Sequence, residues 1–137
     1  MALQSIFPQD MLNSSGADMS LEGIAGKLTF FHDELNLLHW QTTSYATHAC
    51  LGGIYDYVHD FKDSVMEKLM GYANRRVAAY KVESLTITTP DAVVNELLIF
   101  ASNLKKYAEN NSYHDVANLA DSLSGEAAKA RYLLTLS

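Results

Sequence analysis

The chain has 137 residues, 48% of them hydrophobic and 19% charged, with a formal net charge of -6 at pH 7. This composition is typical of one small globular domain, and its scattered Lys and Arg residues argue against tight binding to DNA. The lone Cys50 excludes a disulfide framework, and because no signal peptide or membrane-spanning stretch is evident we expect a cytoplasmic protein.

Residues 1–17 are predicted to be an N-terminal tail, and residues 18–137 a helical bundle. Apolar residues at three- and four-residue spacing predict helices over 18–42 and 45–78. A β-branched run predicts an extended connection over 79–89. Thr89-Pro90-Asp91 is a strong start for a helix over 90–110, and Ser112 with Asp115 resembles a capping box that opens a fourth helix. Four long helices with short links predict an all-α four-helix bundle.

Metal-ligand side chains are concentrated in the first two predicted helices. His39 ends the first, and one side of the second carries His48, Asp56, His59, Asp63 and Glu67. Imidazole and carboxylate donors suit Fe(II), Mn(II) or Zn(II). On a continuous helix His48 and Glu67 lie about 28 Å apart, so one subunit cannot bring both to one ion. Two such helices packed antiparallel across a two-fold axis would, which predicts a site shared within a dimer.

Ordinary structural roles compete with this interpretation. A charged stripe on an amphipathic helix is most often a solvated face, and His32 fits the boundary of the buried stripe. His59 has three open roles, as a metal ligand, a dimer contact or a surface residue. The Gly52-Gly53 pair weakens the second helix, by about 1 kcal/mol per glycine relative to alanine, and therefore requires a reason in packing or function.

These residues resemble a known family. The stretch Leu35-Asn36-Leu37-Leu38-His39-Trp40, followed by His48 and then by Asp63-x-x-x-Glu67, resembles the miniferritins, the Dps-type branch of the ferritin superfamily. The resemblance implies a ferritin-like bundle in which His39 and His48 of one subunit and Asp63 and Glu67 of its partner bind iron. It also implies that Glu67 bridges and that Trp40 sits beside the site as an electron donor.

The chain departs from that family at several places. The family usually has an Asp four residues after the second His, where this chain has Gly52. Asp56 could substitute for that Asp, or iron could bind more weakly. The link between His39 and His48 is shorter than in typical members, and the lysine-rich DNA-binding tail is missing.

The resemblance implies a ferroxidase that oxidises Fe(II) with peroxide or dioxygen and stores iron in a hollow homo-oligomeric shell, commonly of twelve subunits. The compact form resembles short phage-encoded members, for which the compartment would be the host cytoplasm. Two other functions stay open. One is an inert structural or scaffolding bundle, which Gly52 supports, and the other is a DNA-compacting protein, which the net charge of -6 disfavours.

Overall fold

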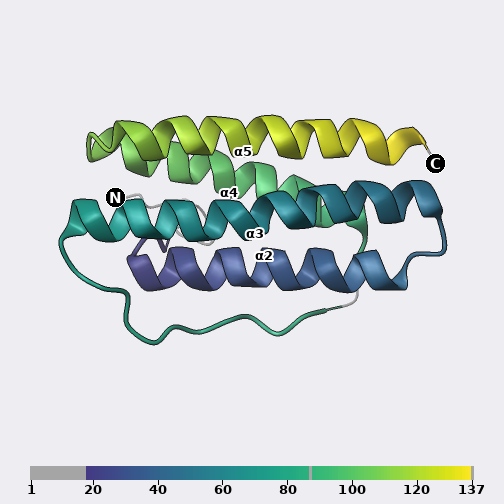
Figure 1. The fold of residues 1–137 in the computed structure, drawn as a ribbon, viewed down its shortest axis with the longest axis horizontal. Coiled ribbons are helices and arrows are strands. Elements are labelled where there is room, and N and C mark those ends of the chain that lie inside the picture. The colour runs from purple at the N-terminus through teal and green to yellow at the C-terminus, as the bar shows by residue number, and fades with distance from the viewer. Residues whose placement is uncertain (1–17, 87, 137) are drawn as a thin grey trace, which may run out of the picture.

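The computed structural model describes residues 18–86 and 88–136. They form the helices α2 (Leu21–Gln41), α3 (Tyr45–Ala73), α4 (Pro90–Asn110) and α5 (His114–Leu133), followed by a short 3-10 helix, η1 (Leu134–Leu136). This confirms an all-α four-helix bundle (Figure 1). The tail predicted over 1–17 lies outside the described residues.

The helices form two antiparallel pairs joined by a long crossover (Figure 1). A short link over 42–44 joins α2 to α3, and a tight turn over 111–113 joins α4 to α5. Between the pairs, residues 74–89 run the length of the bundle alongside α2, so that α3 and α4 point in the same direction. The prediction of short links throughout is therefore wrong for this connection, which we call the crossover segment.

The core lies between the four helices and is built from their apolar stripes. Every residue predicted for the first stripe is buried: Leu21, Ile24, Leu28, Phe31, Leu35 and Leu38. Phe31 of α2 meets Phe100 of α4 edge to face, with ring centroids 5.6 Å apart. The stripe predicted for the second helix is buried as far as Leu69, whereas its last member, Tyr72, is 43% exposed.

Serine and threonine caps start three of the helices. The side chain of Ser20 accepts a hydrogen bond from the Gly23 backbone N–H, and α2 therefore begins at Leu21 rather than at 18. Ser44 caps α3 in the same way, and Thr89 caps α4 as predicted. Each side-chain oxygen satisfies a backbone donor that has no partner within its helix.

Two predicted helix ends are wrong. The second helix stops at Ala73 rather than at 78, because Asn74 adopts a left-handed conformation with φ 56°. Asparagine tolerates this conformation better than most residues and commonly ends helices. The capping box predicted at Ser112 is absent from the described chain, since Ser112 is itself left-handed, with φ 60°, and Tyr113 precedes α5 with no side-chain capping bond.

The crossover segment is tied to α2. Both guanidinium nitrogens of Arg75 donate to Glu22 at 2.9 Å, and the Ala78 backbone N–H donates to the same carboxylate at 2.7 Å. Farther along, a Cβ atom at Gly26 would clash with the backbone carbonyl oxygen of Lys81. Only glycine allows this close approach of the segment to the helix, so both ion pairing and backbone contact fix its path.

Candidate metal-binding site

The end of α2 and the start of α3 bring His39 and His48 into direct contact. Their rings stack with centroids 3.8 Å apart and an interplanar angle of 19°. The Nδ1 atom of each ring lies 2.9 Å from the backbone carbonyl oxygen of the other residue. Because a carbonyl oxygen only accepts, each Nδ1 carries the proton. A neutral ring then has its lone pair on Nε2, which is the tautomer that binds a metal through that atom.

Gly52 has a packing role that the sequence did not reveal. A Cβ atom at this position would lie 3.1 Å from Cε1 and 3.4 Å from Nδ1 of His39. The imidazole of His39 therefore lies close to where a side chain at 52 would begin. A Cβ at the neighbouring Gly53 would have nothing within 4 Å. Only the first of the two glycines is thus explained by contact with His39.

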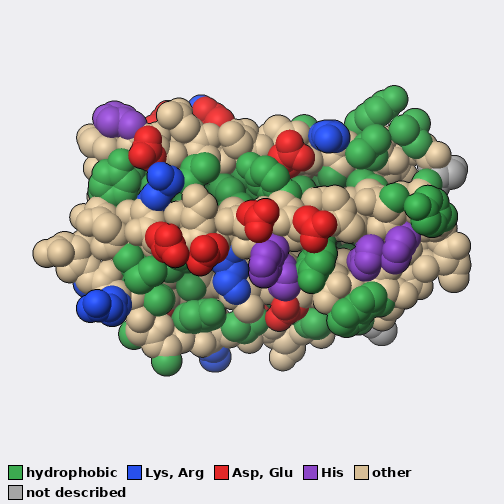
Figure 2. All heavy atoms as spheres, viewed as in Figure 1, with side chains coloured by type: hydrophobic (Ala, Val, Ile, Leu, Met, Phe, Trp, Pro, Cys, Tyr) green, Lys and Arg blue, Asp and Glu red, His purple; other side chains and the backbone are tan. Residues whose placement is uncertain are grey.

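The predicted carboxylate ligands are exposed residues farther along α3. With a rise of about 1.5 Å per residue, Asp63 and Glu67 lie roughly 22 and 28 Å from His48 along the helix. Both line an open groove of about 680 Å³, together with His59, Asp60 and Tyr80 of the crossover segment. Figure 2 shows the face on which acidic side chains and histidines gather along the middle of the molecule.

A single subunit does not gather these candidates around one point. Within residues 18–86 and 88–136, no three His, Cys, Asp or Glu side chains form a group that could hold a metal ion. The structure brings His39 to His48 but leaves Asp63 and Glu67 toward the other end of α3. Asp56 is exposed on α3 between the two sets.

His59 belongs to a different cluster from the stacked pair. Its ring lies 5.3 Å from that of His32 on α2, and the ring of Tyr55 lies 4.6 Å from His32. Tyr55 also faces His39 at 6.3 Å. The rings of His48, His39, Tyr55, His32 and His59 therefore form a continuous row. The spacing of His32 and His39, two turns apart on α2, was the available sequence signal.

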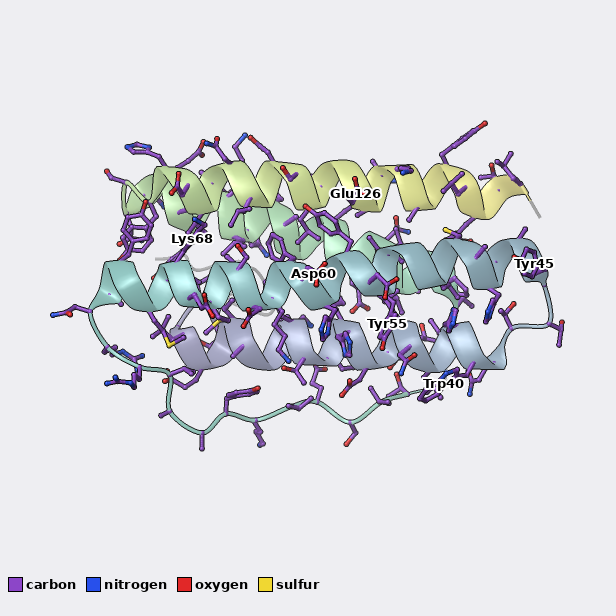
Figure 3. All side chains as sticks on the ribbon, in the orientation of Figure 1. Trp40, Tyr45, Tyr55, Asp60, Lys68 and Glu126 are labelled. Carbon is purple, nitrogen blue, oxygen red and sulfur yellow. The ribbon has the colours of Figure 1, made fainter. Side chains whose placement is uncertain are left out.

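Trp40 and Tyr45 flank the stacked pair as exposed aromatic residues (Figure 3). Their exposed fractions are 70% and 83%, and the Tyr45 ring centroid is 6.2 Å from that of His48. Two large aromatic side chains are therefore exposed beside the half-buried histidines.

Two buried polar side chains complete the description. Cys50 lies in the core, where its thiol donates to the Ala130 carbonyl oxygen at 3.5 Å and burial raises its pKa, which disfavours the thiolate a metal would need. Glu34 is fully buried, and its Oε1 accepts from the Thr86 backbone N–H at 3.3 Å. Glu34 was not among the predicted site residues, although its position three residues after Phe31 places it beside the buried stripe.

No helix in the described part is long and apolar enough to cross a membrane.

Comparison with known proteins places residues 39–134 in the family described as Family of unknown function (DUF5856). The chain belongs to this family. The match begins at His39 and includes every candidate ligand named above. No curated protein and no solved structure matches the chain.

Proposed function

We propose that the protein is a miniferritin-like ferroxidase that oxidises Fe(II) at sites shared between two subunits. The main support for the proposal is that the potential metal ligands of α2 and α3 lie in two groups that are far apart along α3. The stacked pair of His39 and His48 presents Nε2 lone pairs at one end, and the exposed carboxylates of Asp63 and Glu67 lie toward the other.

Antiparallel packing of two α3 helices would combine these halves. A two-fold axis near the middle of α3 sets the histidine end of each subunit against the carboxylate end of its partner, and the symmetry produces the site twice. Exposed Trp40 and Tyr45, beside the histidines, supply apolar surface for the same contact. The result is two imidazoles and two carboxylates around each iron position, a donor set suited to Fe(II).

The chain connectivity supports a ferritin-like classification. Four-helix bundles with one long crossover connection include the ferritin-like folds, whereas up-down-up-down bundles have only short loops. The crossover segment over 74–89 and the resulting parallel α3 and α4 match the first type. Oxidised iron would be stored inside a homo-oligomeric shell, for which twelve subunits is the expected number, in the cytoplasm of a cell or of a phage host.

The proposed reaction treats iron as the substrate. Two Fe(II) ions each give one electron to hydrogen peroxide, which takes up two protons and leaves as two water molecules. Dioxygen is the alternative oxidant. His39 and His48 hold ferrous iron through Nε2, and Glu67 is the proposed bridge from the partner. Where only one Fe(II) is bound, Trp40 beside the site would supply the second electron. Asp56 takes the role of the Asp that Gly52 replaces.

The test removes both carboxylate charges while preserving side-chain shape. We expect Asp63→Asn combined with Glu67→Gln to abolish rapid iron oxidation, followed as Fe(III) absorbance after Fe(II) and peroxide are mixed. Light scattering should show unchanged assembly. The matched control is Glu96→Gln combined with Glu109→Gln, which removes two exposed acids from α4 and should leave the rate unchanged.

The alternatives predict other results. Full activity in the Asp63/Glu67 variant would refute this ligand assignment. A wild-type particle that assembles but neither binds nor oxidises iron would indicate the inert structural bundle. Retardation of duplex DNA in a gel at moderate salt would favour the DNA-compacting function.

A further inference from the structure

We propose that His32 and His59 form a second metal site, specific for zinc-type divalent transition ions and contained within one subunit. It lies on the same face as the proposed iron site but shares none of the ligands proposed for that site. The inference does not depend on iron oxidation or on the dimer.

The separation of the two rings fits a shared ion. Their centroids are 5.3 Å apart and their planes are inclined by 41°. Two imidazoles bound to one ion through bonds of about 2.0–2.1 Å, at a near-tetrahedral angle, have ring centroids about 5 Å apart. The observed separation of the ring centroids therefore matches that of two imidazoles bound to one ion.

His32 is already oriented as a ligand. Its Nδ1 lies 3.1 Å from Oδ1 of Asp33, and since the carboxylate accepts, Nδ1 carries the proton. The other ring nitrogen, Nε2, is buried and has no hydrogen-bond partner in the described structure. A carboxylate that holds the far nitrogen of an imidazole is the usual support of a metal-bound histidine. An ion at Nε2 would satisfy an atom that is otherwise costly to bury.

His59 provides the second protein ligand and lies where the ion would enter from solvent. It is an exposed residue of α3 and lines the open groove, so an ion can reach its ring from solvent in the single subunit. Two protein ligands leave the remaining coordination positions to water. Imidazole donors suit Zn²⁺, Ni²⁺ and Co²⁺ and disfavour Mg²⁺ and Ca²⁺, which require oxygen ligands.

Tyr55 separates this site from the stacked pair. It projects from α3 toward α2 (Figure 3), where its ring lies next to one histidine of each pair. Its ring faces His32 at 4.6 Å and His39 at 6.3 Å. Ions bound to the two pairs would therefore be distinct, and mutations can address them one at a time.

The experiment is a calorimetric titration of the full chain with Zn²⁺, in the Asp63→Asn/Glu67→Gln background that removes the carboxylates of the proposed iron site. We expect His59→Ala to weaken or remove one class of Zn²⁺ binding, with affinity reduced at least about tenfold. His114→Ala is the matched control, because it removes an exposed histidine at the start of α5 and should leave that class intact.

A second measurement protects the test against misfolded variants. In the wild-type chain, Zn²⁺ should move the imidazole ¹⁵N resonances of His32 and His59 together. Unmoved resonances, or equal Zn²⁺ affinity with and without His59, would overturn the proposal.

Iron oxidation gives a separate readout. If it is absent while His59-dependent zinc binding persists, the ferroxidase proposal fails and this site stands. If it is normal while the zinc result is negative, only this site fails.

Discussion

At the residue scale, the contact between His39 and Gly52 links helix stability to the candidate site. The absence of a side chain at 52 lets the imidazole lie close to the backbone of α3. In that position its Nδ1 reaches the His48 carbonyl oxygen, and the reciprocal bond fixes the second ring. The glycine that departs from the miniferritin pattern is thus a packing partner of a proposed ligand.

Alanine substitutions at the two glycines should separate packing from helix propensity. Gly53→Ala should raise the free energy of unfolding by about 0.5–1 kcal/mol, because a Cβ there meets no atom within 4 Å. Gly52→Ala should gain less or lose stability, since the His39 ring must move aside. It should also slow iron oxidation. Thermal denaturation and the Fe(III) absorbance assay measure both effects.

Equal stabilisation by the two substitutions, with unchanged iron oxidation, would contradict this role for Gly52. Gly53→Ala serves as the control because it makes the same chemical change one residue away.

Sequence spacing could predict that His39 and His48 lie on adjoining helix ends, but not how their rings are arranged. The positions of His39 and His48 on facing helix ends followed from periodicity. The row that joins Tyr55, His32 and His59 did not, because it depends on the rotation of α2 against α3 and on side-chain rotamers. The bundle itself was predictable from four amphipathic patterns.

At the element scale, the end of α3 shows what an apolar pattern leaves out. Val77 packs against the core from the crossover segment, beyond Tyr72, the last member of the predicted stripe. The helix predicted over 45–78 is therefore too long at its C-terminal end. The left-handed Asn74 ends the helix, and Glu22 of α2 accepts hydrogen bonds from Arg75 and from the Ala78 backbone N–H. Local sequence could not indicate this partner, because Glu22 lies more than fifty residues earlier in the chain.

Acid should loosen the attachment of the crossover segment to α2. The hydrogen bonds from Arg75 and from the Ala78 backbone N–H lower the pKa of Glu22 from its ordinary value of 4.5 to about 2. The folded pKa lies below the unfolded one, so this carboxylate stabilises the fold fully above pH 4.5 and loses its contribution as pH falls toward 2. We expect Glu22→Gln to lower Tm at pH 7 and to approach wild type near pH 2.

Thermal unfolding across this pH range measures the difference between the two proteins. The exposed Glu109→Gln is the control, and its offset from wild type should be much smaller at pH 7. A Glu22→Gln offset that stays constant down to pH 2 would show that the carboxylate charge does not stabilise the segment.

At the scale of the whole molecule, the fold class was predictable but the path of the chain was not. A β-branched run correctly indicated an extended connection before α4. Nothing in its composition showed that it would travel the length of the bundle, because a link of this size can either turn back or cross. Contacts that decide the path, such as that of Gly26 with Lys81, join residues far apart in sequence.

Association of subunits should depend on the aromatic end of the α2–α3 face. We expect the wild-type particle to have a mass several times the 15.2 kDa of one chain. Tyr45→Lys should yield monomers in light scattering, because packing would bury an unpaired charge. Ile99→Lys changes a residue on α4 that is 52% exposed, and should still give at least dimers. A monomeric wild type would refute the shared site altogether.

The crossover segment also divides the molecule into two helical hairpins, and this has a consequence for folding. Within each hairpin the contacts are local, so α2 with α3 and α4 with α5 can pair early. The hydrogen bonds from the crossover to α2, such as Ala78 to Glu22 and Thr86 to Glu34, join residues 56 and 52 positions apart and are expected to form after α2 and α3 have paired. Each hairpin would then form before the crossover segment that connects them makes its hydrogen bonds to α2.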